Sequence, residues 1–207
     1  SRKEPPSRTV NFNSAEFMVF LTVVLLTYAA VFRCALARNL LLLSASYFFY
    51  MTWNWKYAGL IALSTVVDYA ISLQLATDRP RRFRKTLLIV SITMNLGILC
   101  IFKYYNFFAD SLKDAVGAFG VNLDVTYLTI ILPVGISFYT FQTLTYALDI
   151  YFGRMKPTKS LLNFALFISF FPQLVAGPIE RARHLLPQIE AKRHTSAQQL
   201  FDGTWLM

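Results

Sequence analysis

The stretch LLNFALFISFFPQLVAGP, residues 161–178, decides how this chain is expected to fold. Its apolar part, residues 161–175, is short for a helix that crosses a membrane, which takes about 20 apolar residues. Pro172, Gly177 and Pro178 then interrupt a helix at its end. The stretch therefore predicts a segment that enters the membrane without crossing it as one uninterrupted helix.

The basic residues behind this stretch support the same interpretation. If the segment crossed fully, Arg181, Arg183, Lys192 and Arg193 would face outward, against the preference of basic residues for the cytoplasmic side. A segment that turns back keeps them in the cytoplasm. Irregular backbone at membrane depth is tolerated only where protein or a water-filled cavity satisfies its polar groups. We therefore predict that residues 171–181 line an interior funnel.

Further apolar blocks precede this segment, at residues 16–32, 39–55, 56–76, 86–102 and 127–150. The chain has 207 residues, a mean hydropathy of +0.46 and only 15% charged residues, which is typical of a membrane protein. Residues 104–126 carry Phe107, Phe108 and Leu112 near helical spacing and predict an interfacial helix. The fold class is all-α: a polytopic transmembrane helical bundle with about five to six membrane segments, one interfacial helix and one re-entrant segment.

The charge distribution predicts an orientation. The formal net charge is +9, and the basic residues lie mainly between apolar blocks, most densely at residues 77–85, a predicted cytoplasmic loop. Positive charge placed this way is explained by topology, so no nucleic-acid partner is expected. Cys34 and Cys100 show no CxxC spacing and are expected to be small, buried apolar residues.

Several polar residues interrupt the apolar blocks. A carboxyl near the middle of a span, such as Asp68, costs about 2.5–3.5 kcal/mol and is expected to face the bundle interior. There it either lines a tunnel or bonds to a neighbouring helix. Asp149 either lines the tunnel or pairs with Arg154. Gln142 and the nearby Thr140, Thr143 and Thr145 act either as interhelical hydrogen-bonding groups or as a channel wall.

The sequence contains no complete catalytic set. His184 and His194 lie in the basic tail, away from any nucleophile or carboxylate at an informative spacing, and are expected to be solvated. No metal-ligand cluster is present in the sequence pattern.

Three motifs carry a family resemblance: LPVGISFYTFQTL at residues 132–144, DIY at 149–151 and FFPQLVAGPI at 170–179. NLLLL at 39–43, STVVDY at 64–69 and FKYYNFF at 102–108 support them. Together they resemble the membrane-bound O-acyltransferase family, in the branch of bacterial alginate O-acetyltransferases and D-alanyl transferases. The resemblance runs from about residue 11 to 188.

The resemblance implies a many-helix enzyme with a tunnel through a bacterial inner membrane. No cofactor is bound; a cytoplasmic acetyl-CoA or acyl-carrier thioester is the donor substrate. The acceptor is an extracytoplasmic polysaccharide, or a partner acetyltransferase completes the transfer, and membrane lipid surrounds the protein. The family's catalytic histidine lies in a later segment that this chain lacks. Residues 1–15 are thus expected to be an extension, and 16–207 the N-terminal part of the acyltransferase domain.

The predicted function is therefore O-acetylation of an alginate-like cell-envelope polysaccharide by the full-length protein, the present chain being inactive alone. No catalytic residue is assigned. The tunnel and donor-side candidates are Asp68, Gln142, Asp149, Pro172, Gln173, Gly177, Pro178 and Arg181, with Arg183 as a second phosphate-attracting residue. The alternative is a transporter or translocation subunit without acyl chemistry, which broken helices and intramembrane carboxyls suit equally well. A non-catalytic partner that docks an extracytoplasmic transferase is a third hypothesis.

Overall fold

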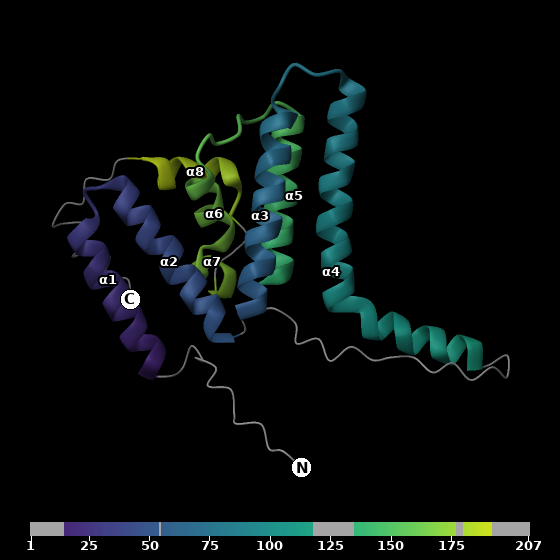
Figure 1. Ribbon diagram of the computed structural model, residues 1–207, viewed down its shortest axis with the longest axis horizontal. Coiled ribbons are helices and arrows are strands. Elements are labelled where there is room, and N and C mark those ends of the chain that lie inside the picture. The colour runs from purple at the N-terminus through teal and green to yellow at the C-terminus, as the bar shows by residue number, and fades with distance from the viewer. Residues whose placement is uncertain (1–14, 54, 118–134, 177–179, 192–207) are drawn as a thin grey trace, which may run out of the picture.

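A computed structural model describes residues 15–53, 55–117, 135–176 and 180–191, without the side chains of residue 53 and residues 174–176. All secondary structure in these ranges is helical, which confirms the predicted all-α membrane bundle (Figure 1). The helices are α1 (Ala15–Val31), α2 (Ala35–Trp53), α3 (Trp55–Leu75), α4 (Arg81–Gly117), α5 (Ile136–Tyr151), α6 (Leu161–Ser169), α7 (Phe171–Ala176) and α8 (Ala182–Glu190).

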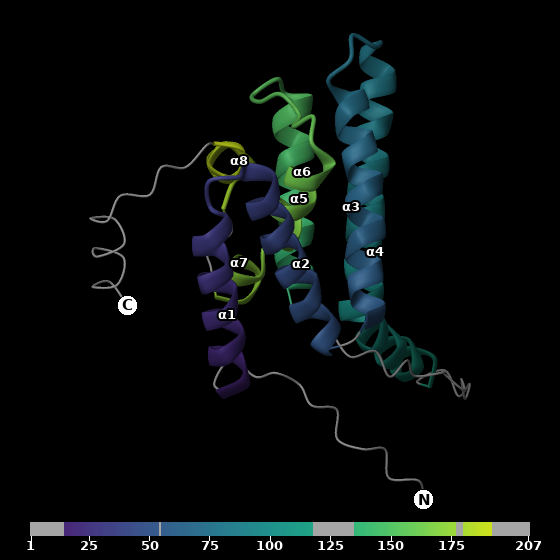
Figure 2. The ribbon, with the colours of Figure 1, turned by 60° about the vertical axis from the view of Figure 1, so that its left-hand side comes forward.

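The helices run up and down, so their connections gather at two ends. Figures 1 and 2 both place the α1–α2, α3–α4 and α5–α6 connections at one end, together with α8. We call this the basic end, because it carries Arg33, Arg38, Arg79, Arg81, Arg82, Arg84, Lys85, Arg154, Lys156, Lys159, Arg181 and Arg183. By length and composition, α3 and α4 are each able to cross a membrane, while α1 and residues 161–173 are apolar but shorter.

The bundle surface is apolar, as a lipid-facing surface must be. In α1 only Val24 is buried, whereas Leu26 is 68% exposed. Cys34 and Cys100 are both exposed, so the expectation that they are buried was wrong. Cys34 lies in the α1–α2 connection and Cys100 on the surface of α4, where a small apolar side chain is tolerated.

The long helix α4 corrects two predicted boundaries. It begins at Arg81, so the second half of the predicted basic loop 77–85 is helical. It then continues to Gly117, beyond the predicted span 86–102. The predicted interfacial helix is therefore not a separate element over residues 104–117; it is the bent end of α4, which lies across the bundle axis (Figure 1). Phe107, Phe108 and Leu112 are exposed on it. Residues 118–126 lie outside the described part.

The helix α5 begins later than the predicted block 127–150. Its first residue is Ile136, preceded by Gly135 in a left-handed conformation with φ 79°, which glycine adopts without the steric cost of a Cβ atom. At 16 residues, α5 is shorter than the roughly 20 that a straight crossing takes. Residues 127–134 lie outside the described part.

The segment α6–α7–α8 turns back, as predicted. Helix α6 starts at the basic end and breaks at Phe170, where ψ is 103°. The backbone N–H of Phe171 then donates to Oγ of Ser46 at 3.2 Å. Ser46 lies about 16 Å along α2 from its start, roughly half of the ~30 Å thickness of a bilayer core. Helix α8 is again at the basic end (Figure 1).

The role predicted for Pro172 needs correction. Instead of ending the helix, Pro172 sits in the first turn of α7, where its missing N–H costs nothing because the first N–H groups of a helix lack intrahelical partners. The break falls at Phe170, before the proline. Phe171 is anchored there by Phe20 of α1 and Phe49 of α2, with ring centroids 5.5 and 5.8 Å away.

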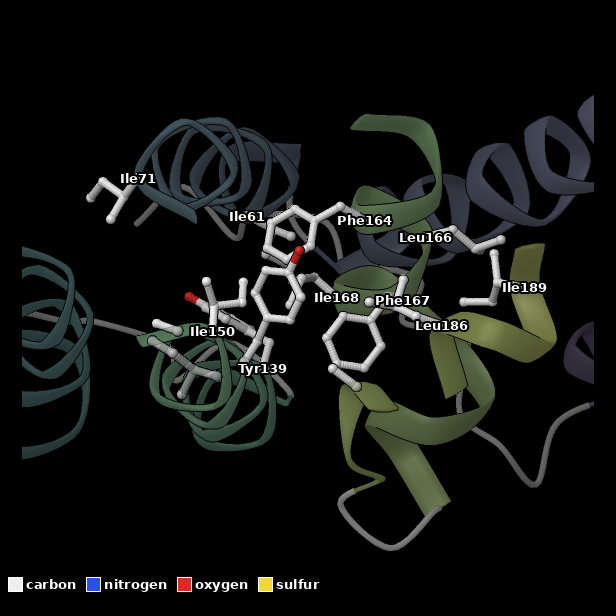
Figure 3. Close-up of a cluster of buried hydrophobic side chains, with 14 of the residues drawn as sticks. Ile61, Ile71, Tyr139, Ile150, Phe164, Leu166, Phe167, Ile168, Leu186 and Ile189 are labelled. Carbon is white, nitrogen blue, oxygen red and sulfur yellow. The ribbon is translucent and has the colours of Figure 1, made fainter. Parts of the chain in front are cut away.

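The hydrophobic core forms where α3, α5 and α6 meet. Ile61 of α3, Tyr139 and Ile150 of α5 and Phe164 of α6 belong to one buried cluster between these helices, drawn in Figure 3. Tyr146 of α5 joins this core, with its ring centroid 4.8 Å from that of Phe164. The re-entrant segment therefore packs against the centre of the bundle.

Candidate functional site

A buried polar cluster joins α3 to α4. Asp68 is 4% exposed and accepts a hydrogen bond from Oγ of Ser91 at 2.8 Å. Nδ2 of Asn95 donates to both carboxyl oxygens of Asp68, at 3.0 and 2.9 Å. The carboxyl thus faces the bundle interior and bonds to a neighbouring helix, the structural alternative raised by the sequence. Its role as a tunnel residue stays a prediction.

A second set of buried polar groups has no hydrogen-bond partner among the described residues. It comprises Oη of Tyr50, Oγ1 of Thr65, Oη of Tyr139, Oγ1 of Thr140 and both amide atoms of Gln142. These atoms come from α2, α3 and α5. Orphaned buried polar atoms are uncommon in folded proteins, and each one calls for water, a ligand or further protein. We call this set the unpaired polar set.

The predicted threonines of α5 separate into two kinds. Thr143 and Thr145 donate to the carbonyls of Tyr139 and Gln142 within their own helix, so these bonds do not join two helices. A place in a channel wall stays a prediction for both residues. Thr140 and Gln142 belong to the unpaired polar set. They remain candidates for the lining of a hydrophilic path.

Arginines at the basic end hold helix ends together. The Nε of Arg84 donates to the carbonyl of Leu75, and its Nη2 donates to that of Tyr151, at 2.8 and 3.0 Å. One side chain therefore supplies donors to the C-terminal ends of both α3 and α5, where carbonyls lack intrahelical partners. Asp149 pairs with Arg154 at 3.6 Å, the ion pair anticipated from the sequence. The two buried carboxyls therefore have different partners: Asp68 bonds to α4, and Asp149 pairs with Arg154.

The return of the chain depends on Arg38. This arginine is 2% exposed. Its Nη2 donates to the carbonyls of Ile189 and Ala191 at 2.6 and 3.2 Å, and its Nη1 donates to that of Ala191 at 3.2 Å. Its Nε donates to Oδ1 of Asn39 at 3.0 Å. Asn39 also donates to the carbonyl of Ile189 and to Oδ1 of Asn163. Helix α8 is therefore fastened to the starts of α2 and α6.

Two hollows open near the basic end. One, of about 390 Å³, is lined by α1, α2, the α6–α7 break and α8, with Arg38, Asn39 and Pro172 among its lining residues. The other, of about 360 Å³, is lined by Arg79, Arg81, Arg84, Tyr151 and Phe152. The second hollow combines guanidinium groups with aromatic rings, the side chains that bind phosphates and flat ring systems.

The predicted site residues fall in separate places. Arg181 is exposed and precedes α8, and Gln173 is buried in α7. Gly177 and Pro178 lie outside the described residues, as does the middle of the predicted funnel lining. His184 is exposed on α8, and His194 lies outside the described part. The described residues therefore do not bring the predicted set into one constellation.

Sequence reasoning missed the polar partners of Asp68 and the two arginines, Arg38 and Arg84, that bond to helix ends. Ser91 and Asn95 stand four residues apart in an apolar span, a spacing that puts both on one helix face, and this signal pointed to a partner for Asp68. Arg38 and Arg84 gave no comparable signal, because an arginine at a membrane edge is already explained by topology.

Known proteins with similar sequences carry related names. The chain is 40% identical over 181 residues to a probable alginate O-acetylase AlgI of Azotobacter vinelandii, covering 86% of this chain and 36% of that protein. It is 42% identical over 160 residues to a protein of the same name from Pseudomonas aeruginosa, covering 76% and 30%. A peptidoglycan O-acetyltransferase of Helicobacter pylori is 32% identical over 211 residues, covering 88% and 39%.

These matches cover most of this chain but only part of each relative. The chain spans about a third of the length of the curated relatives it matches. No protein-family model matches it, and no solved structure matches it. The identity nevertheless extends over most of this chain, and the names of these relatives agree with the resemblance of the motifs at residues 132–144 and 170–179. The chain belongs to the membrane-bound O-acyltransferase family, in the branch of the alginate O-acetylases.

Proposed function

We propose that the complete protein transfers an acetyl group to hydroxyls of an extracytoplasmic cell-envelope polysaccharide. The observation that carries this proposal is the 40% identity to an alginate O-acetylase over 181 residues. The acceptor is alginate or a related polymer, reached directly or through a partner acetyltransferase. The donor is acetyl-CoA or an acyl-carrier thioester from the cytoplasm.

The chemistry divides between two parts of the complete protein. A hydroxyl attacks a thioester carbonyl efficiently when a general base removes its proton, and the base assigned to this family is a histidine. The described residues supply no such constellation, so we place the base in another part of the protein. The present chain contributes the wall of the passage, in which the unpaired polar set and Asp68 contact water or substrate. The break at Phe170 shapes its inner end.

The test of this function is an acetyl-transfer assay in membranes. Membranes containing the complete protein are expected to move radiolabelled acetyl from acetyl-CoA, or from a loaded carrier, onto the polysaccharide fraction. Membranes containing the 207-residue chain alone are expected to show background transfer. If the complete protein shows no transfer with either donor while it moves substrate unchanged across the membrane, the transporter alternative replaces this proposal.

The orientation gives a prediction of its own. We place the basic end in the cytoplasm of a bacterial inner membrane that the chain crosses several times. Arg183→Cys, made after replacing Cys34 and Cys100 by serine, is expected to be labelled by a membrane-impermeant maleimide only when the cytoplasmic face is open. Ser111→Cys, on the bent end of α4, is the control and is expected to be labelled from outside. Labelling of Arg183→Cys in intact cells contradicts the proposed orientation.

Donor use gives a second prediction. Arg181 is exposed at the start of α8, beside Arg183, where its guanidinium can bind a phosphate of CoA or phosphopantetheine. Arg181→Ala is expected to raise the apparent KM for the donor by about three- to tenfold, because one hydrogen bond of a solvent-exposed guanidinium is worth about 1 kcal/mol, with kcat nearly unchanged. The steady-state rate as a function of donor concentration measures it.

The matched control for this variant is Lys103→Ala. It removes the same charge from an exposed position in α4, towards the opposite end of the bundle from Arg181. Its donor KM is expected to stay at the wild-type value. Equal KM values for both variants and the wild type would show that Arg181 contributes only to topology.

A further inference from the structure

We propose that the 390 Å³ hollow beside α1 binds one acyl chain of an anionic phospholipid, with the lipid phosphate at Arg38. We call this hollow the α1 groove. Its walls come from α1, α2, the α6–α7 break and α8. The proposal is independent of acyl transfer, because it assigns the groove a resident lipid and not a substrate.

The lining of the α1 groove changes from polar to apolar along its length. Tyr28, Arg38, Asn39 and Gln188 line it, and all four belong to helix segments at the basic end (Figure 1). Leu21 of α1 and the residues of the α6–α7 break line the part that lies deeper in the bundle. A ligand that matches this order has a polar head at the membrane surface and an apolar tail. Phospholipids have that order and surround the protein on every side.

The charge of the groove selects an anionic head. The residues that line it include no acidic side chain, and the groups that Arg38 bonds are backbone carbonyls and the amide of Asn39. Within the described part of the chain, these neutral acceptors leave the charge of a guanidinium that is 2% exposed without an opposite charge at ion-pair distance. Buried charges are generally paired. Nη1 carries two N–H groups and uses one of them in these bonds, so its second N–H is available for a further acceptor. A phosphate supplies both the acceptor and the charge.

The size of the groove suits a single acyl chain. Ligand pockets run from about 300 to 1,000 Å³, and 390 Å³ is at the small end of that range. This is too little for a further helix, whose diameter is about 10 Å. Basic pockets between membrane helices on the cytoplasmic side are where anionic lipid head groups bind. A lipid here also packs α1, of which only Val24 is otherwise buried, onto the bundle.

Two tryptophan variants on neighbouring residues of α1 test the assignment. Leu25 lines the α1 groove and is 49% exposed, so Leu25→Trp fills the groove without crowding a closed core. Leu26 is 68% exposed and does not line the groove, so Leu26→Trp is the matched control. The complete protein, purified in detergent, is used for both. Its thermal unfolding is followed with added phosphatidylglycerol, phosphatidylcholine or inorganic phosphate, and bound lipid is counted by native mass spectrometry.

Phosphatidylglycerol is expected to raise the Tm of the wild type and of Leu26→Trp, phosphatidylcholine less, and inorganic phosphate not at all. The fraction of protein carrying one phosphatidylglycerol is expected to fall about tenfold in Leu25→Trp, which corresponds to a blocked site. Equal effects of the two lipids, or the full effect from phosphate alone, overturn the proposal. So does a loss of lipid in both variants. No lipid response in the wild type means that other protein covers the groove, which also overturns it.

Discussion

Replacing Asp68 with leucine is expected to destabilise the folded bundle by about 2 kcal/mol. The carboxyl accepts hydrogen bonds from Oγ of Ser91 and, through both oxygens, from Nδ2 of Asn95. Leucine removes the acceptor but leaves the hydroxyl of Ser91 buried without it. An unsatisfied buried donor costs more than the bond itself was worth. The measurement is unfolding of the complete protein in mixed micelles, followed by denaturant titration.

The controls test whether the loss of stability comes from the buried donors that are left without an acceptor. In the triple variant Asp68→Leu, Ser91→Ala, Asn95→Leu the whole cluster is apolar, so most of the lost stability is expected to return. Ser64→Ala removes a buried hydroxyl of α3 whose bond, among the described residues, is to the carbonyl of Ile61 in its own helix, and it is expected to change stability little. A triple variant as unstable as Asp68→Leu contradicts the hydrogen-bonding explanation.

The same variants also decide whether Asp68 contributes to the passage. A triple variant that regains stability but transfers no acetyl group assigns Asp68, Ser91 or Asn95 a role in activity. A stable and active triple variant makes the cluster structural. This distinction matters because an intramembrane carboxyl is by default a functional hypothesis, whereas the observed contacts satisfy it with groups of the neighbouring helix.

The architecture could be predicted where the sequence pattern has one physical cause. The apolar blocks gave the helices, because a membrane span must be long, apolar and hydrogen-bonded within itself. The turn of the re-entrant segment was also predictable. Its length and the charges behind it both opposed a crossing, and α8 indeed returns to the basic end.

The errors arise where two causes compete at the same residues. Pro172 was expected to end a helix, yet it lies in the first turn of α7, because proline is tolerated in a first helical turn although it disrupts a helix interior. The span 86–102 and the interfacial helix within 104–126 were expected as two separate elements. A helix can also change direction without losing its backbone hydrogen bonds, and α4 stays continuous to Gly117.

The candidate site was less predictable than the fold, for a related reason. The sequence identified Asp68 and Gln142 as polar residues in apolar surroundings. Whether each one finds a hydrogen-bond partner depends on how its helix is rotated relative to its neighbours. The structure pairs Asp68 with Ser91 and leaves the amide atoms of Gln142 without a partner in the described part. The sequence of α3 or of α5 taken alone does not show whether its polar residue finds a partner on a neighbouring helix.

Replacing Arg38 with methionine is expected to release α8 from the bundle and to destabilise the fold by about 3 kcal/mol. Methionine retains much of the side-chain length but offers no donor. The carbonyls of Ile189 and Ala191 then lose the guanidinium that satisfies the end of α8. Limited proteolysis of the complete protein in membranes is expected to cut within residues 182–191 at least tenfold faster, because a fall in opening free energy of about 1.4 kcal/mol already suffices for that.

Arg33→Met is the matched control, because it removes a positive charge without removing a hydrogen bond to α8. Arg33 lies in the α1–α2 connection, five residues before Arg38, but it is exposed and lies over the ring of Phe32. Both variants remove one positive charge from the basic end, so any effect on membrane orientation is expected to be the same for both. Rapid cleavage in Arg38→Met alone therefore reports the bonds to α8. Identical cleavage rates in the two variants would mean that the positive charge at this end of the bundle, and not the hydrogen bonds of the Arg38 guanidinium, keeps α8 in place.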